Sequence, residues 1–243
     1  VMYEEGIDPR KDTKLHTVCI GAEPHSEEQR KRIEQLLGVK AYNCFGMSEM
    51  NGPGVAFECT EQNGLHIWED NVIVEIVDPV TLQPVPEGEV GELVLTTINR
   101  EAMPLLRYRT RDLTCILPGD CPCGRTHKRL ARFKGRSDDM IILKGVNLFP
   151  IQIEKILMQF KELGSNYLIT LETIGNSDEM LIEVELSDLF TDDYSALQRL
   201  TKGITRQLKD ELLLTPRIKL VAKGSLPTTD GKAVRVKDHR KLC

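Results

Sequence analysis

Three cysteines and one histidine are the side chains in this sequence whose chemistry best suits a metal ion. Cys121 and Cys123 flank a single proline, and Cys59 and His66 lie upstream on either side of a Gln-Asn-Gly turn. Three thiols and one imidazole form a soft four-ligand set of the kind that holds tetrahedral Zn²⁺. The spacing is not that of a standard zinc finger, so two alternatives stay open: His127 replaces His66, or all four are ordinary residues. Such a zinc would be structural and would tie a β-rich part of the chain to the loop before residue 135.

Two polar segments follow predicted strands. Residues 21–24, Gly-Ala-Glu-Pro, come after a short apolar strand at Thr17–Ile20. Residues 45–49, Phe-Gly-Met-Ser-Glu, come after a strand predicted at residues 39–44. Loops at the carboxyl ends of such strands form the ligand crevice of open α/β sheets. We therefore expect both segments to line a binding site.

A helix between these two strands completes an α/β unit. Ser26 has a glutamine three positions on, which is typical of a capping box, and Gly38 ends the helix. Ile33, Leu36 and Leu37 fall on one helical face. Strand, helix and strand in this order predict an α/β architecture.

The central part of the chain has the alternation of a small antiparallel sheet or barrel, with strands at Val72–Val77 and residues 88–97. Residues 135–139 are polar, and we expect them to form a flexible connection. An apolar strand is predicted at residues 140–143 and a turn at residues 144–147.

The last hundred residues have the pattern of a compact α+β domain. Apolar spacing predicts two helices, at residues 150–160 and 192–213. Strands are predicted at residues 166–172, residues 180–186 and Arg217–Val221. The boundary between this domain and the larger preceding part falls in the polar stretch that precedes residue 140.

Composition excludes several classes of protein. The 243 residues are 40% hydrophobic and 28% charged, which is typical of a soluble globular protein. A net charge of -5 gives no reason to expect nucleic acid or an acidic membrane as a partner, and no apolar run approaches the ~20 residues of a membrane-spanning helix. Seven scattered cysteines favour reduced thiols, and the N-terminus lacks the pattern of a signal peptide. We expect a cytoplasmic protein.

Seven short motifs in a fixed order resemble the adenylate-forming (acyl-CoA synthetase, AMP-binding) superfamily, and within it the phenylacetate-CoA ligase branch. They are G-A-E-P, F-G-M-S-E, M-N-G-P-G-V-A, G-E-L-V-L-T-T, Y-R-T-R-D, G-R-S-D-D-M-I-I-L-K-G-V-N-L-F-P and P-T-T-D-G-K-A-V-R, spanning Gly21 to Arg235. The resemblance implies that residues 1–135 are the C-terminal part of the large AMP-binding domain, with an α/β unit over 1–60 and a β-rich subdomain over 61–135. It implies a hinge at 136–139 and a small mobile α+β domain over 140–243.

The resemblance implies an ATP-dependent, AMP-forming acid-CoA ligase. A carboxylate and ATP would give an acyl-adenylate and pyrophosphate, with Mg²⁺ bound, and the acyl group would then pass to CoA as a thioester. Small residues at 52–56, the implied acyl pocket, suit a flat aryl acid similar to phenylacetate. A homodimer is left open. The alternatives are a non-catalytic fragment that binds nucleotide or CoA, and an adenylation protein that loads a carrier protein.

The resemblance also implies a role for each motif residue. Lys232 would meet the carboxylate and α-phosphate oxygens, and Glu49 would hold Mg²⁺. Asp138 would be the hinge. The nucleotide would be bound by Gly21, Ala22, Glu23, Pro24, Asn43, Phe45, Gly46, Met47, Ser48, Asp112 and Arg136. The passage for the pantetheine arm of CoA would be lined by Lys144, Gly145, Val146 and Asn147.

The family's Gly/Ser/Thr-rich loop, which clamps the β- and γ-phosphates, precedes these motifs and does not occur in this sequence. We therefore expect a C-terminal portion or truncated form of a ligase that does not adenylate efficiently alone. We also expect the chain before about Tyr42 to be mobile or to pair with another chain.

Overall fold

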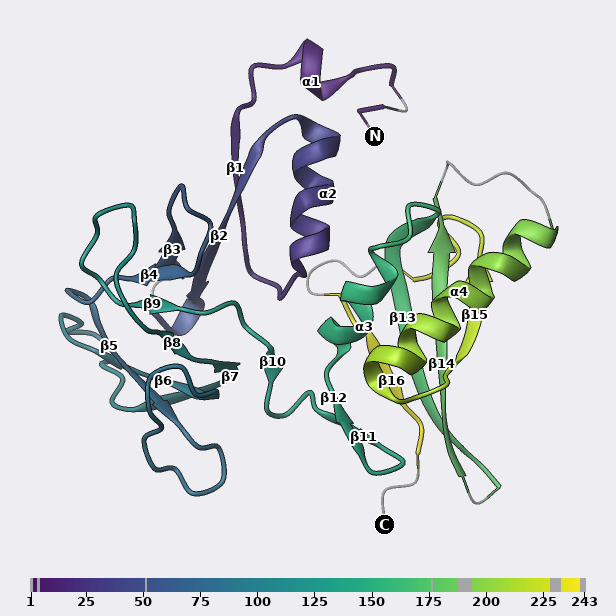
Figure 1. The fold of residues 1–243 in the computed structure, drawn as a ribbon. Coiled ribbons are helices and arrows are strands. Elements are labelled where there is room, and N and C mark those ends of the chain that lie inside the picture. Colours follow the sequence, from purple (N-terminus) through teal and green to yellow (C-terminus); the bar gives the residue numbers. More distant parts are fainter. Residues whose placement is uncertain are drawn as a thin grey trace. The chain divides into compact units, whose positions relative to one another are not determined.

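Two units of the chain each have a hydrophobic core of their own. The computed structural model describes residues 2–3, 5–50, 52–175, 177–187, 194–227 and 233–240. One unit consists of Val1–Pro24 and Arg30–Asp138, and the other of His25–Gln29 and Asp139–Cys243. Both mix helices with β-sheet, so the fold is of the mixed α/β kind with several sheets (Figure 1).

The first unit contains a sheet with strand order β1-β2-β3-β4-β9-β8. The strands are β1 (Thr17–Ile20), β2 (Lys40–Met47), β3 (Gly52–Glu58), β4 (Leu65–Ile67), β8 (Ile116–Leu117) and β9 (Arg129–Leu130). β1 and β2 are parallel, which requires a crossover, and helix α2 (Glu27–Leu37) supplies it. The predicted strand–helix–strand order is thus confirmed. A one-turn helix, α1 (Pro9–Asp12), precedes β1.

The second sheet of this unit is antiparallel, with strand order β10-β7-β6-β5. Its strands are β5 (Val72–Val77), β6 (Gly91–Thr97), β7 (Tyr108–Thr114) and β10 (Gly135–Arg136). Residues from both sheets, including the fully buried Leu65 and Leu93, pack into one core cluster. The prediction of a β-rich central region is confirmed.

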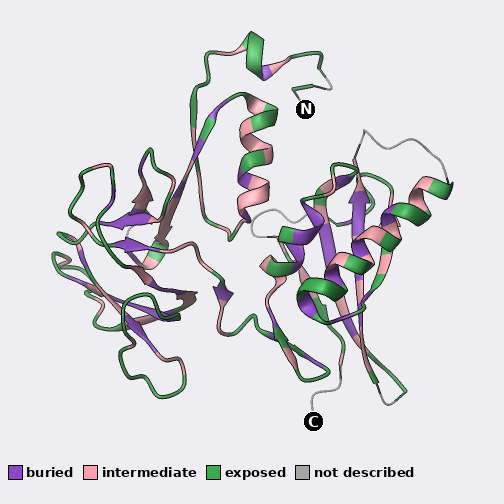
Figure 2. Cartoon of the chain, viewed as in Figure 1, coloured by how far each residue is buried: buried purple, intermediate pink, exposed green. Residues whose placement is uncertain are grey.

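The second unit is built on a sheet with strand order β15-β14-β13-β16. The strands are β13 (Leu163–Ile174), β14 (Ser177–Leu186), β15 (Arg217–Val221) and β16 (Val236–Asp238). Helices α3 (Pro150–Leu157) and α4 (Tyr194–Leu212) bury their apolar faces in the same core as the strands, and the buried residues of these strands stand out in Figure 2. A short hairpin, β11 (Ile141–Leu143) and β12 (Val146–Leu148), precedes α3.

Several element boundaries differ from those predicted, and at β2 and β12 the reason is that cross-strand pairing extends further than the local sequence indicates. Strand β2 continues through Met47, which lies opposite Gly52 of β3, and a 3₁₀ helix, η1 (Ser48–Met50), follows. The turn predicted at residues 144–147 contains only Lys144 and Gly145, because Val146 pairs with Leu143 in the hairpin. The first helix of the second unit ends at Leu157 rather than residue 160.

Residues 135–139 do not form an uninterrupted flexible connection. Gly135 and Arg136 are strand β10 and lie opposite Leu113 and Asp112 of β7. These two residues are therefore part of a sheet and not of a loop.

On the apolar face of helix α2, Leu36 is exposed, with an exposed fraction of 49%. The helix turns a polar side toward the sheet instead. Its buried residue is Arg30, which pairs with Glu34 at 3.0 Å, and the Glu34 carboxylate accepts a hydrogen bond from the backbone N–H of Ala41 in β2. Within the ranges that the structure describes, no helix is long and apolar enough to span a membrane.

Candidate nucleotide site and candidate metal centre

The carboxyl ends of β1 and β2 bring the first two predicted segments to one sheet edge. Ile20, the last residue of β1, lies opposite Asn43 of β2. Gly21 therefore leaves the sheet beside Cys44, the residue after Asn43. A Cβ on Gly21 would lie 2.5 Å from the carbonyl oxygen of Cys44, and only glycine permits this approach. Ala22 then adopts a positive φ of 68°, which turns the chain away from the strand. Glu23 and Pro24 complete the segment.

The second segment continues from the end of β2 into η1. The Phe45 ring contacts the Phe133 ring, with centroids 4.4 Å apart. Ser48 is exposed and Glu49 half-buried, and the guanidinium of Arg100 donates to the backbone oxygen of Glu49. Ser48 and Glu49 therefore lie in η1, directly after the end of β2, and the bond from Arg100 holds this helical turn in place.

Asp112 and Arg136, both predicted to bind the ribose, lie opposite each other on β7 and β10. They are far apart in sequence, so the register of the sheet is what brings them together. Arg136 also donates two hydrogen bonds to Asp138, at 2.9 and 2.8 Å. These bonds lower the pKa of Asp138. The acceptor and donor predicted for the ribose are thus neighbours, and the predicted hinge residue is tied to one of them.

The residues predicted to line the CoA passage form the turn and second strand of the β11–β12 hairpin in the second unit. Lys144 and Gly145 have φ angles of 49° and 80°, as expected for a two-residue hairpin turn. The ammonium of Lys144 pairs with the Glu179 carboxylate at 2.8 Å and lowers its pKa. Val146 and Asn147 follow in β12. Lys232, the predicted catalytic lysine, lies outside the described residues.

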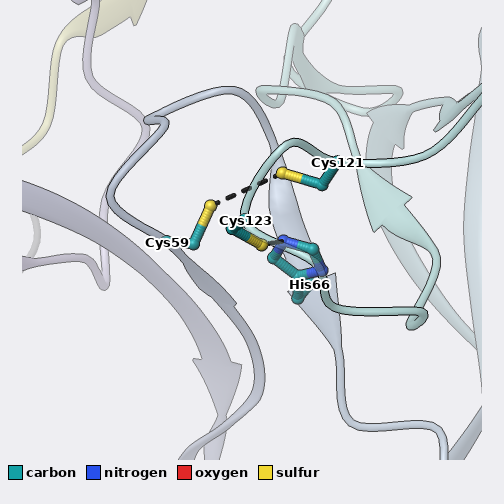
Figure 3. A group of neighbouring side chains, drawn as sticks. All are labelled: Cys59, His66, Cys121 and Cys123. Atoms are coloured by element: carbon teal, nitrogen blue, oxygen red, sulfur yellow. Dashed lines mark hydrogen bonds between the residues drawn. The ribbon is translucent and has the colours of Figure 1, made fainter.

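Cys59, His66, Cys121 and Cys123 form a cluster in the first unit (Figure 3), with their ligand atoms all within 4.8 Å of one another. The Sγ atoms of Cys59 and Cys121 are 3.7 Å apart, and Cys123 Sγ lies 3.3 Å from Nε2 of His66. His127, the alternative histidine, instead presents its backbone oxygen to Nδ1 of His66 at 3.2 Å. The structure therefore brings together the four residues predicted as a metal set and favours His66.

The thiols of this cluster have opposite pKa shifts. Burial raises the pKa of Cys59 to about 11. The backbone N–H of Arg125 lowers the pKa of Cys123 to about 7 by donating to its sulfur. Burial also lowers the pKa of His66. The cluster thus holds a neutral imidazole beside one thiol that ionises readily.

Comparison with known proteins identifies the family. A model described as AMP-binding enzyme matches residues 4–99, and one described as AMP-binding enzyme C-terminal domain matches residues 145–240. Together these two regions cover most of the chain, and both resemble parts of AMP-binding enzymes. The first match contains the segments at the ends of β1 and β2, and the second contains Gly145 and its neighbours. The recognition of this family from seven motifs is confirmed.

The relatives of this chain include phenylacetate-coenzyme A ligases. That of Thermus thermophilus is 42% identical over 98% of this chain and 57% of its own length, and that of Pseudomonas putida is 44% identical over 97% and 53%. A crystal structure of 2-hydroxyisobutyryl-CoA ligase in complex with R3-HIB-AMP matches with a TM-score of 0.90 and 31% identity, over 98% of this chain and 51% of that chain. The chain thus spans about half the length of the curated relatives it matches.

Sequence reasoning missed a buried ion pair beneath the Tyr-Arg-Thr-Arg-Asp motif of this chain. Glu92 of β6 is fully buried and accepts two hydrogen bonds from Arg109 of β7, at 2.8 and 2.7 Å. These bonds lower the pKa of Glu92. Because the pair anchors the strand that carries Asp112, it is part of the support of the candidate site. An acidic residue in the apolar run of β6 was the signal that could have revealed it.

A polar network around β13 and β14 was missed as well. The buried Glu185 carboxylate accepts hydrogen bonds from the backbone N–H of Leu226, at 2.9 Å, and from the Asn166 side chain, at 3.1 Å. Asn166 in turn accepts a bond from Arg235 at 3.0 Å. Leu226 and Arg235 lie on either side of the segment that contains Lys232, so one network holds both described flanks of that segment.

Proposed function

We propose that the protein to which this sequence belongs is an ATP-dependent, AMP-forming CoA ligase for a small aryl carboxylic acid similar to phenylacetate. The carboxylate would attack the α-phosphate of ATP to give an acyl-adenylate and pyrophosphate, and the CoA thiol would then displace AMP. The observation that carries the proposal is the cross-strand pair of Asp112 and Arg136. It combines an acceptor-only carboxylate with a fixed cation on a sheet edge, as the two hydroxyls and the negative charge of a nucleotide require.

The adenosine end of the nucleotide would lie against the first unit. Asp112 would accept hydrogen bonds from both ribose hydroxyls, and Arg136 would donate to the ribose. Asn43 offers a donor and an acceptor for the adenine edge. The close approach of Gly21 to β2 supports a flat adenine surface at residues 21–24, with Phe45, Gly46 and Met47 on the adjoining strand.

The phosphate end would lie at η1. Ser48 is exposed and would donate to a phosphate oxygen, and Glu49 would hold Mg²⁺. One half-buried carboxylate fits this ion, which is commonly bound by one or two carboxylates together with substrate phosphates. When bound, Mg²⁺ would offset phosphate charge. Lys232 would stabilise the charge that develops on the α-phosphate in the transition state.

The thioester step would use the second unit. Asp138 would be the pivot of a hinge-type domain movement. Lys144, Gly145, Val146 and Asn147 would then line the passage for the pantetheine arm, where the missing side chain of Gly145 leaves room. Of the implied acyl pocket, Val55 and Ala56 are fully buried in the core, so residues 52–54 would contact the acid.

The proposal is tested on the complete gene product with a panel of phenylacetate, benzoate, 2-hydroxyisobutyrate and acetate. Pyrophosphate release and CoA-thioester formation are measured separately. We expect phenylacetate to give the highest kcat/KM in both. Asp112→Asn should lower pyrophosphate release about 10- to 100-fold, since a charge-assisted hydrogen bond contributes about 1.5–3 kcal/mol.

Two outcomes would favour the alternatives. Adenylation followed by transfer to a carrier protein, but not to free CoA, would indicate a carrier-loading enzyme. Nucleotide or CoA binding without pyrophosphate release from any acid would indicate a non-catalytic binding protein. A homodimer remains to be tested by measuring the mass in solution.

A further inference from the structure

We propose that Cys59, His66, Cys121 and Cys123 bind one structural Zn²⁺ ion in the first unit. This inference concerns a metal site outside the nucleotide residues and does not depend on the proposed ligase activity. Three sulfur ligands and one imidazole nitrogen are a complete set for a tetrahedral zinc. Four protein ligands leave no open position for water or substrate, so the ion would have no catalytic role.

The distances within the cluster agree with the edges of a zinc tetrahedron. With Zn–S bonds of about 2.3 Å and a Zn–N bond of about 2.0 Å, two sulfurs lie about 3.8 Å apart, and a sulfur and a nitrogen about 3.5 Å. The corresponding separations in the structure are 3.7 Å for Cys59 and Cys121 and 3.3 Å for Cys123 and His66. A disulfide would require sulfurs about 2.0 Å apart. The cluster therefore has room for an ion at its centre.

Two similar turns present the cysteines. Cys59 starts a turn closed by a hydrogen bond from the Gln62 N–H to its carbonyl, and Cys121 starts one closed in the same way by Gly124. Each of these two turns is therefore fixed by a backbone hydrogen bond of its own.

His66 is oriented as a zinc ligand. A carbonyl oxygen can only accept a hydrogen bond, so the contact between Nδ1 and the His127 backbone oxygen places the ring proton on Nδ1. In the neutral ring this leaves the lone pair on Nε2, the atom that faces Cys123 (Figure 3). Metal-binding histidines commonly fix their tautomer in this way.

The site lies where the sheet itself is weakest. Cys59 follows β3, His66 is in β4, and Cys121 and Cys123 are in the loop between β8 and β9. Strands β8 and β9 have two residues each and β4 has three, so the ladders between them contain few hydrogen bonds. A metal would cross-link all these segments. The ion would also hold β9 in place. The segment after β9 contains Phe133, whose ring contacts Phe45, and it continues into β10 with Arg136.

The first test is the metal content of the full chain purified without chelators from zinc-supplemented growth. We expect about one zinc per chain in the wild type, loss of most of it in Cys123→Ser, and full retention in Cys19→Ser. Cys19 is an exposed cysteine of β1 outside the cluster, so its variant is the matched control. Wild-type protein without metal, or equal zinc in both variants, would overturn the proposal.

A second variant keeps the test decisive if Cys123→Ser does not fold. Cys123→His retains four ligands, so we expect it to keep its zinc and to fold. Replacement of zinc by Co²⁺ in the wild type should give the strong visible absorption of a tetrahedral cobalt–thiolate site. A strong chelator should lower the melting temperature of the wild type, and zinc should restore it. Weak octahedral cobalt absorption, or a melting temperature unchanged by chelator and zinc, would contradict a structural site.

Discussion

Gly46 lies where strand β3 passes so close that a side chain has no space. A Cβ at this position would lie 2.1 Å from the carbonyl oxygen of Gly52 and 2.3 Å from the Cα of Pro53. Both atoms belong to the backbone, so neither can move without shifting a strand. We predict that Gly46→Ala lowers the free energy of unfolding by about 1–3 kcal/mol, the usual cost of overpacking.

Gly54 is the matched control for this substitution because it lies on the same strand β3, and no atom lies within 4 Å of the position that its Cβ would take. Gly54→Ala should leave the free energy of unfolding nearly unchanged. Denaturant unfolding of the two variants measures the difference. Equal stability of the two variants would show that β3 does not constrain this end of β2.

Glu92 is a buried charged residue whose loss should destabilise the first unit. Its carboxylate is fully buried and binds Arg109 through two hydrogen bonds, and the Arg109 side chain is 31% exposed. We predict that Glu92→Gln lowers the free energy of unfolding by about 2–4 kcal/mol, slightly less than the full cost of breaking a buried pair. Glu75→Gln removes a similar but exposed pair with Arg107 and should cost no more than about 1 kcal/mol.

The same pair predicts a pH dependence of stability. The hydrogen bonds from Arg109 lower the pKa of Glu92 in the folded state. The contribution of the carboxylate is therefore complete at neutral pH and is lost as the pH falls below about 4.3, the value in an unfolded chain. Unfolding free energies measured between about pH 6 and pH 3 should fall less steeply for Glu92→Gln than for the wild type. Parallel curves would contradict the assignment.

At the scale of the elements, local periodicity predicted helices and long strands but not where pairing ends. The stripe of Leu200, Ile204, Leu208 and Leu212 is visible in the sequence because it repeats every three to four residues, and all four are buried. The short strands β10 and β12 contain two and three residues. The partner of β10 is β7, which lies outside any short window of sequence, whereas β12 pairs with the adjacent strand β11 across a two-residue turn.

The β11–β12 hairpin provides a test of the proposed CoA passage. Gly145 has φ +80°, and no atom lies within 4 Å of where its Cβ would be. An alanine would therefore clash with nothing in the protein and would cost only the strain of a left-handed residue, about 1–2 kcal/mol. We predict that Gly145→Ala slows thioester formation about tenfold while pyrophosphate release is unchanged, because the methyl group would occupy the passage.

Gly175→Ala separates this effect from strain. Gly175 has φ +63°, also with no atom within 4 Å, and lies in the turn between β13 and β14. Gly175→Ala should lower the free energy of unfolding about as much as Gly145→Ala does. It should leave the rates of both pyrophosphate release and thioester formation unchanged. If the two variants slow the thioester step equally, the effect of Gly145→Ala is one of stability and not of the passage.

At the scale of the whole molecule, residue types were predictable and their meeting points were not. The four side chains of the metal cluster were identified by ligand chemistry, but Cys59 and Cys121 are 62 positions apart, and only the folded sheet brings them together. Asp112 and Arg136 likewise meet through strand register. Leu36 is exposed although it belongs to an apolar stripe, because Arg30 and Glu34 take the inner side of α2 through an ion pair that hydrophobic periodicity does not register.

The two hydrophobic cores predict how the whole molecule unfolds. One cluster consists of residues of the first unit and the other of residues of the second, and among the described residues none belongs to both. We therefore expect two calorimetric transitions. Leu93 and Ile182 are fully buried in the first and second core, respectively.

Leu93→Ala should lower only one of these transitions and Ile182→Ala only the other, because each substitution leaves a cavity that costs about 2–5 kcal/mol in its own core. Differential scanning calorimetry of both variants measures the shifts, and limited proteolysis at the lower transition should release the unit that remains folded. A single transition that both substitutions shift by the same amount would show that the units unfold together. That result would argue against a second unit that moves as a separate body.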